Sequence, residues 1–155
     1  MITSTAFAAA AQPTAADLLA GSRWGWLGAT GTPESSLPAE IEGARRAACS
    51  APNLSFRRAG DQLVRFEHAA TPAGVTIYAK SRTTPTQEGV LIEGFVKADS
   101  AAPLATMTLL RGDQMLKVKA GMFGDRFYVR CPQPGALMYD PPRQQPNEPG
   151  TRRRP

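Results

Sequence analysis

With 155 residues, the chain has the length of one domain that can bury a hydrophobic core without help from a metal. Its 14 glycines and 14 prolines argue against a helical bundle and favour strands and turns. The formal net charge of +5 is not gathered into a dense basic face, which argues against a nucleic-acid-binding protein and predicts only mild attraction to anionic surfaces.

Residues 1–20 are expected to be a signal-peptide remnant or a flexible N-terminus. Small residues around Ala6 and Ala8 are typical of the end of a secretory signal, although the basic and apolar regions that export requires do not precede them. Either the true start lies further upstream or the likeness is accidental. We expect a periplasmic or secreted protein. No run approaches the roughly 18 apolar residues of a membrane span, so we expect no transmembrane segment.

A β-barrel domain is predicted for residues 21–131, beginning with the stretch GSRWGWLG. Trp24 and Trp26 are two residues apart, so in a strand their side chains lie on the same face. Gly25 between them marks a bulge or a place where another backbone comes close. Core filling is the favoured interpretation of both tryptophans, and the alternative for Trp26 is the wall of a ligand pocket.

A short helix is predicted near residues 38–48, where Ile41, Ala44 and Ala48 share one side. We expect it to plug one end of the barrel. Cys49 at its end and Cys131 in the last strand predict a disulfide that ties the start of the sheet to its finish. The alternative is two buried thiols in a cytosolic protein, and we expect no metal site.

Seven runs between residues 53 and 131 alternate apolar and polar side chains, as half-buried strands do. With the strand at residues 23–27 they give about eight antiparallel strands in succession, and the stretch RTTPTQ between two of the runs is predicted to be a polar turn. The predicted fold class is therefore all-β, an up-and-down meander that closes into a small barrel, with a two-sheet sandwich as the alternative. The side chains predicted to share its inner face include Leu54, Phe56, Val64, Phe66, Val75, Ile77, Val90, Ile92, Val96, Ala105, Met107, Leu109, Leu116, Val118, Phe127 and Val129.

Residues 132–155 are predicted to be a proline-rich basic tail, largely disordered, because seven of these 24 residues are proline. The arginines at 152–154 are either a small attachment to lipid or an acidic partner, or simply a solvated tail, which we favour.

Candidate ligand-binding residues are those expected in the barrel interior. His68 ends its strand on the same parity as Phe66, where it would bind a ligand carboxylate, act as a base, or merely be a hydrogen-bonded strand-end histidine. No catalytic motif or phosphate loop is found, so the expectation is a protein that is not an enzyme and has no cofactor. The interior candidates are Trp24, Trp26, Phe66, His68, Ile77, Ile92, Met107 and Phe127.

Candidate partner-binding residues lie in the last hairpin. If its strands pair, four cations are expected on one outer face around Tyr128, where they either receive an acidic partner or form a solvated surface. Met122 and Phe123 stand between glycines in the connecting loop, so they either fold over the barrel mouth or anchor a partner. The four cations are Lys117, Lys119, Arg126 and Arg130.

The opening LLAGSRW, the strand meander and the cysteine pair resemble small bacterial lipocalin-like, or calycin-type, barrels. The resemblance implies a non-enzymatic envelope binding protein for a small apolar ligand or a partner protein. Envelope protease inhibitors of the same barrel type are also similar, which implies, as one alternative, a periplasmic hydrolase inhibitor acting through barrel loops. Another alternative is an envelope structural or stress factor with a surface-attaching tail.

Overall fold

The computed structural model describes residues 11–28, 41–68, 73–119, 122 and 124–133. In these ranges the chain forms one antiparallel sheet of nine strands, in the order β4-β3-β2-β1-β9-β8-β7-β6-β5, and two helices. The predicted all-β class is confirmed. The elements are α1 Ala15–Leu19, β1 Arg23–Trp26, α2 Ile41–Ala48, β2 Leu54–Ala59, β3 Gln62–Glu67, β4 Gly74–Tyr78, β5 Lys80–Pro85, β6 Gly89–Phe95, β7 Ala105–Leu110, β8 Met115–Lys119 and β9 Asp125–Cys131.

The ninth strand comes from a segment that the sequence pattern assigned to a polar turn. Lys80–Pro85 is strand β5, paired with β6 from Lys80 opposite Phe95 to Pro85 opposite Val90. Its threonines suit a pleated strand, and Pro85 stands at its last position on the outermost strand of the order, where a missing N–H is tolerated. The polar turn prediction was wrong because exposure alone does not exclude a strand.

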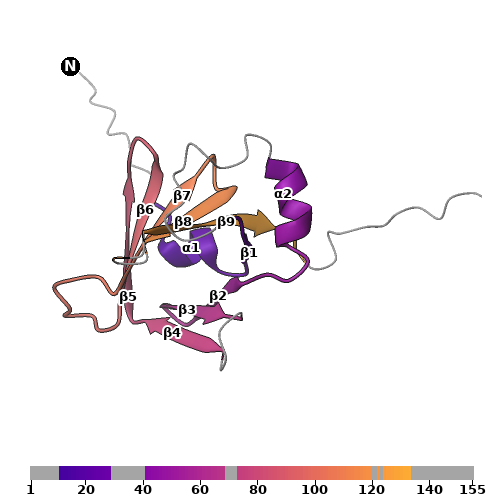
Figure 1. Cartoon of the computed structure of the whole chain (residues 1–155). Coiled ribbons are helices and arrows are strands. Elements are labelled where there is room, and N and C mark those ends of the chain that lie inside the picture. The colour runs from indigo at the N-terminus through magenta and orange to yellow at the C-terminus, as the bar shows by residue number, and fades with distance from the viewer. Residues whose placement is uncertain (1–10, 29–40, 69–72, 120–121, 123, 134–155) are drawn as a thin grey trace, which may run out of the picture.

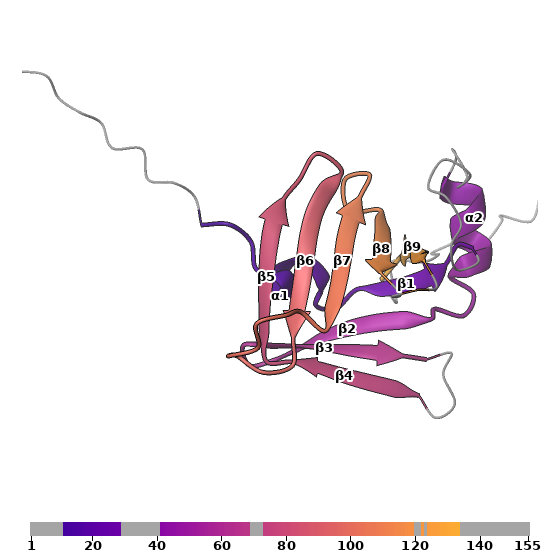
Figure 2. The same ribbon diagram turned by 60° about the vertical axis from the view of Figure 1, so that its left-hand side comes forward.

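The sheet nearly closes into a barrel because its two outermost strands, β4 and β5, are consecutive in the chain. Only Ala79 separates them, and the chain bends there, so β2, β3 and β4 run across the direction of β5, β6 and β7 (Figure 2). The other seam joins β1 to β9, from Arg23 opposite Cys131 to Trp26 opposite Tyr128. A nearly closed barrel therefore replaces the sandwich alternative.

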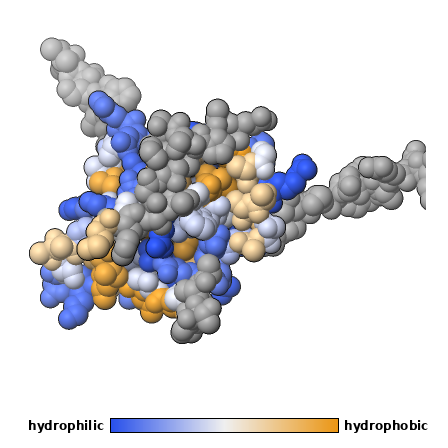
Figure 3. Space-filling model, viewed as in Figure 1, coloured by the Kyte–Doolittle hydropathy of each residue, from blue (hydrophilic) through white to orange (hydrophobic). Residues whose placement is uncertain are grey.

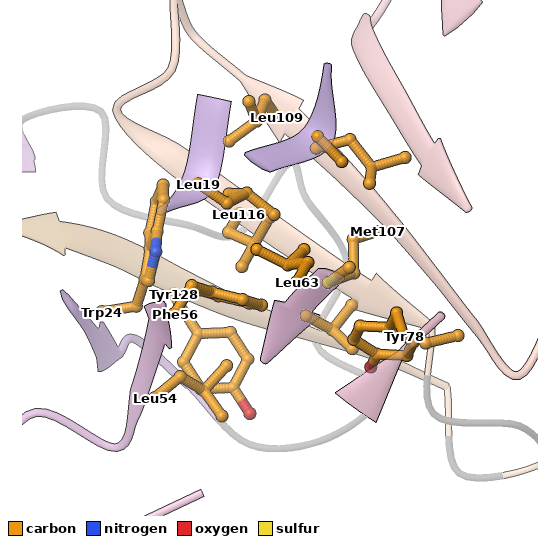
Figure 4. Packing of buried hydrophobic residues seen from close by; sticks show 14 of the residues in the cluster. Leu19, Trp24, Leu54, Phe56, Leu63, Tyr78, Met107, Leu109, Leu116 and Tyr128 are labelled. Atoms are coloured by element: carbon orange, nitrogen blue, oxygen red, sulfur yellow. The ribbon is translucent and has the colours of Figure 1, made fainter. Parts of the chain in front are cut away.

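The barrel interior is filled by side chains and by α1. Figure 1 shows α1 within the ring of strands, and Ala15 and Leu19 belong to the same buried cluster as Trp24, Phe56 and Met107 (Figure 4). Thr14 caps this helix: its Oγ1 accepts from the Asp17 N–H at 3.1 Å, while Asp17 Oδ2 accepts from the Thr14 N–H at 2.9 Å. Part of the segment predicted as a signal remnant or flexible N-terminus is thus core. Residues 1–10 lie outside the described part.

The helix predicted to plug the barrel, α2, lies outside it, beside β1 and β9 (Figure 1). Its Ile41 and the neighbouring Leu27 pack on a second cluster formed by Leu110, Met115 and Phe127 on the outer face of the sheet. A Cβ on Gly25 would stand 2.3 Å from the Ala48 carbonyl oxygen, so the predicted close approach of another backbone is confirmed.

The predicted disulfide is confirmed as well. Cys49 directly follows α2 and is bonded to Cys131, the last residue of β9. Since Cys131 pairs with Arg23 in the seam, the bond fixes α2 to the place where the first and last strands meet.

The inner face of β3 and β4 differs from the prediction. Phe56 is paired with Arg65 and Leu63 with Tyr78, so β3 turns Leu63, Arg65 and Glu67 inward. The segment QLVRFEH carries apolar residues on both parities, and alternation chose the wrong one. The four residues predicted inward that face outward here are Val64, Phe66, Val75 and Ile77, of which Val75 is 57% and Ile77 50% exposed.

Elsewhere the predicted pattern holds except at the end of β6 and along β9. Ile92, Ala105, Met107, Leu109, Leu116 and Val118 are in the interior cluster, as predicted. Val96 is exposed because β6 ends at Phe95. Phe127 is buried in the outer cluster on which Ile41 of α2 packs, and Val129 is buried on the same outer face of β9. The face of β9 that points into the barrel carries Tyr128 instead.

Candidate functional site

A pocket of about 220 Å³ opens at the mouth of the barrel, at the open end of the β2–β3 hairpin. Its apolar walls come from the first residue of β2, from both sides of the start of β7, and from β8 and β9. Its charged groups come from β3, the end of β8 and the start of β9. The apolar and aromatic lining residues are Leu54, Leu104, Ala105, Val118 and Tyr128, and the charged ones are Arg65, Glu67, Lys119 and Arg126.

Arg65 and Glu67 form an ion pair inside this pocket, with 2.7 Å between the Arg65 Nη2 and the Glu67 Oε1. Their strand places both inward, and the Arg65 side chain is only 15% exposed. Its guanidinium carbon lies 5.9 Å from the centre of the Tyr78 ring. Arg65 Nε and the Tyr78 hydroxyl are both buried and have no hydrogen-bond partner in the described structure. Hydrogen-bonding capacity therefore remains unused beneath the pocket.

Two tyrosines near these charges hold their protons more firmly than usual. Burial raises the pKa of Tyr78, against a smaller opposing effect of the Arg65 charge. Burial likewise raises the pKa of Tyr128, against the charge and hydrogen bond of Arg126. Both hydroxyl groups are therefore protonated at neutral pH.

The charges of the pocket do not cancel. Three cationic side chains and one carboxylate line it, which leaves a net charge of +2. Glu67 is engaged by Arg65, and neither Lys119 nor Arg126 forms an ion pair with a carboxylate of the described ranges. The mouth is thus a cationic pocket with partly apolar walls.

Arg130 stands at the opposite end, near α1, and is fully engaged by the protein. Its guanidinium carbon lies 4.7 Å from the Trp24 ring centre, its Nε–H donates to the Asp113 carbonyl oxygen at 2.9 Å, and its Nη2 donates to the Leu18 carbonyl oxygen at 3.2 Å. A 3.7 Å ion pair with the Asp113 carboxylate completes the set. Burial lowers the pKa of Arg130, against a smaller opposing effect of Asp113.

The predicted interior candidates are divided among three places. Trp24, Ile92 and Met107 lie in the filled core (Figure 4), where the Trp24 Nε1–H donates to Ser22 Oγ at 2.6 Å. Trp26 is 47% exposed, so the core-filling interpretation is wrong for it. The pairing of β1 with β2 reaches only as far as Trp24. The remaining candidates, Phe66, His68, Ile77 and Phe127, are outside the interior cluster.

His68 is exposed at the end of β3. Its Nε2 lies 2.8 Å from Ser55 Oγ, its backbone N–H donates to the Asn53 carbonyl oxygen, and its ring stacks on Phe66 at 6.4 Å between centroids. These contacts fit the strand-end interpretation. They place the imidazole on the outer face, away from the barrel interior.

The four cations predicted to share one outer face are separated by the sheet. Val118 is opposite Arg126 and Leu116 opposite Tyr128, so Arg126, Tyr128 and Arg130 are on the inner face. Lys117 is on the outer face and pairs with Glu88 at 2.6 Å. Lys119, at the strand end, lines both the mouth pocket and an outer pocket of about 230 Å³ that Thr106 and Thr108 also line. Met122 is exposed, and Phe123 lies outside the described residues.

The sequence analysis missed Arg65, Glu67 and Leu104 as pocket residues. Arg65 and Glu67 were assigned to the outer face with the wrong parity of QLVRFEH. The available signal was the hairpin itself: the short turn AGD fixes which residues of β3 stand opposite Leu54 and Phe56.

Comparisons with models of protein families, with curated proteins and with solved structures found no match to this chain. None of the helices in the described ranges has the length and apolar character that a membrane crossing needs. In the same ranges, no three or more His, Cys, Asp or Glu side chains come together as a metal site.

Proposed function

We propose that this chain is a non-enzymatic envelope binding protein of lipocalin-like type that takes a small ligand at the mouth of its barrel. The nearly closed barrel, the disulfide between its sequence-distant ends and the signal-like start of the sequence support this proposal. A disulfide favours an oxidising compartment, the periplasm or the exterior.

The mouth pocket is the observation that carries the proposal. Beneath it, Phe56, Met107 and Leu116 are almost completely buried in a filled interior. The ligand site is therefore shallow, and an apolar ligand deep inside the barrel has less support. A concave, partly apolar pocket with a few convergent polar groups is the usual form of a small-molecule site.

The test is a titration of the full chain, with its disulfide formed, with short amphipathic molecules such as 1-hexanol and hexanoate. Amide chemical shifts of Ala105, Val118 and Tyr128 should move and saturate. The Leu104→Ser variant should bind more weakly because it removes part of the apolar wall, whereas Val96→Ser, an exposed residue outside the pocket lining, serves as a matched control. Absence of saturable shifts with every probe would contradict the proposal.

Partner-protein binding is a second candidate, favoured by one observation on the outer face. Val75 and Ile77 are half or more exposed on the same side of the outermost strand β4, and Val75 stands opposite Phe66. Apolar atoms are visible along the lower edge of the molecule in Figure 3, where Figure 1 places β4. Such a patch is typical of a protein contact.

A hydrolase inhibitor would be one form of this second function. The test is whether an envelope hydrolase is inhibited by the wild-type protein and released from inhibition by the Val75→Ser, Ile77→Ser double variant. Equal inhibition by both proteins, or none by either, would count against it.

A further inference from the structure

We infer that the mouth pocket selects a small amphipathic monoanion, a carboxylate on a short apolar chain. The inference rests on the proposed binding function and adds the chemical class of the ligand. It follows from three observations: an inward arginine whose buried Nε has no acceptor in the described ranges, two further cations without a carboxylate partner in the same ranges, and apolar walls of limited size.

Arg65 is placed where an arginine is costly without acceptors. It shares the inner face of β3 with Leu63 and stands opposite Phe56, both of which belong to the core. A buried guanidinium needs acceptors for its N–H groups. Glu67 accepts from one terminal nitrogen, and Nε has no acceptor in the described structure. Arg65 also lines the pocket, where an anion would supply a second acceptor group for its guanidinium.

Arg126 and Lys119 extend the same cationic surface to the rim. Neither has a carboxylate partner in the part of the chain that the structure describes. Arg126 is adjacent in sequence to Phe127 and on the same inner face as Tyr128, whose hydroxyl is a protonated donor. Charged donors around one carboxylate form stronger hydrogen bonds than neutral donors do.

The walls limit the size of the ligand and require an apolar part. Leu54, Leu104 and Val118 contribute side-chain carbon to the pocket. Its volume of about 220 Å³ corresponds to about seven groups of the size of water, at roughly 30 Å³ each. A carboxylate with a chain of about six carbons matches that size, and a longer chain would extend into solvent because the interior below is filled.

Glu67 directs the charge of the ligand to one side of the pocket. Its carboxylate repels a ligand charge placed next to it, so the anionic group is expected beside Arg126 and Lys119. Much of the remaining lining is apolar, which suits an uncharged remainder of the ligand rather than a second charge. The net positive charge of the lining disfavours a cationic ligand.

The experiment compares hexanoate, 1-hexanol and inorganic phosphate on the full chain by amide shifts at Tyr128 and Arg126. Hexanoate should bind about tenfold more tightly than 1-hexanol, since charge-assisted hydrogen bonds are added to the same apolar contact. Phosphate, with its second charge and no apolar part, should bind more weakly than hexanoate.

Two variants locate the effect. Arg126→Gln and, independently, Lys119→Gln should each weaken hexanoate binding several-fold and leave 1-hexanol unchanged. Arg46→Gln removes the same charge from the exposed side of α2 and should change neither. Equal binding of 1-hexanol and hexanoate, tighter binding of phosphate, or unchanged hexanoate binding in both mouth variants would overturn the inference and leave the proposed function standing. Failure of both hexanoate and 1-hexanol to bind would remove the proposed function itself.

Discussion

The two ends of the barrel use the same kind of side chain in opposite ways. Near α1, Arg130 stacks on Trp24 and donates to two backbone carbonyl oxygens, so its N–H groups serve the fold. At the mouth, Arg126 has no ion pair with a described carboxylate, and Arg65 has a buried Nε without an acceptor. An arginine engaged by backbone acceptors is structural, whereas an arginine that lines a pocket and has no backbone acceptor in the described ranges is a candidate for binding.

The disulfide lies at the seam between β1 and β9 and gives the largest expected effect. The Cys49→Ser, Cys131→Ser variant should lose about 4–5 kcal/mol of unfolding free energy. The bond joins residues 82 apart in the sequence, so its removal raises the conformational entropy of the unfolded chain. Chemical denaturation with and without a reductant measures this loss. If the two ends are independent of the seam, the folded fraction of the variant should still bind at the mouth. A variant that binds more weakly at the mouth but unfolds with an unchanged free energy would contradict the account.

Replacing each of the two arginines by a neutral residue tests the difference between the two ends directly. Arg130→Met should cost about 2–3 kcal/mol of unfolding free energy, because it leaves two carbonyl oxygens without a donor and removes the contact with Trp24. Arg126→Gln should change the unfolding free energy by about 0.5 kcal/mol or less. Urea denaturation of both variants decides the matter, and equal losses would show that the two ends do not differ.

The acid response should come from the α1 end. Two hydrogen bonds from Thr14, followed by one from Arg58, lower the pKa of Asp17 from 3.8 to about 2. A lowered carboxyl pKa stabilises the folded state above the unfolded pKa, and this contribution is lost as pH falls from about 4 to about 2. Asp17→Asn should flatten the stability–pH curve in this window, as measured by denaturant midpoints. An unchanged slope would contradict the helix cap as its source.

The alkaline response should come from the tyrosines near the mouth. Because burial raises the pKa of Tyr78 and Tyr128, the folded state favours their neutral forms. Their contribution to stability is complete below the unfolded pKa near 10 and is lost as pH rises through the raised values. Ultraviolet absorbance should therefore show that the tyrosines ionise at a higher pH in the folded protein than in urea. Tyr78→Phe should remove part of the delayed signal, and identical titrations in both states would rule out this burial effect.

The sequence predicted the fold where alternation was unambiguous. Met107 stands between two threonines and Val118 between two lysines, and both are in the core. In QLVRFEH, by contrast, Leu63 and Val64 are both apolar, so only pairing with β2 decides that Arg65 points inward. Because the inward and outward residues of β3 were assigned the wrong way round, the pocket residues Arg65 and Glu67 were missed as well.

Helix placement was the other part that the sequence pattern did not decide. The stretch from Thr14 to Asp17 carries the spacing of a capping box, a signal for α1 that its resemblance to a signal peptide concealed. For β9 the alternation was correct, since Phe127 and Tyr128 face opposite sides. Which side is inside depends on α2 covering Phe127, a tertiary contact that no local pattern contains.

The most direct test of the difference between the two ends is a hexanoate titration of the wild-type protein that follows the Tyr128 amide and the Trp24 indole N–H in the same spectra. We predict a saturable shift at Tyr128 and none at Trp24, because the indole is held by Ser22 in the filled core. A shift at Trp24 equal to that at Tyr128, or none at Tyr128, would contradict the assignment of binding to the mouth.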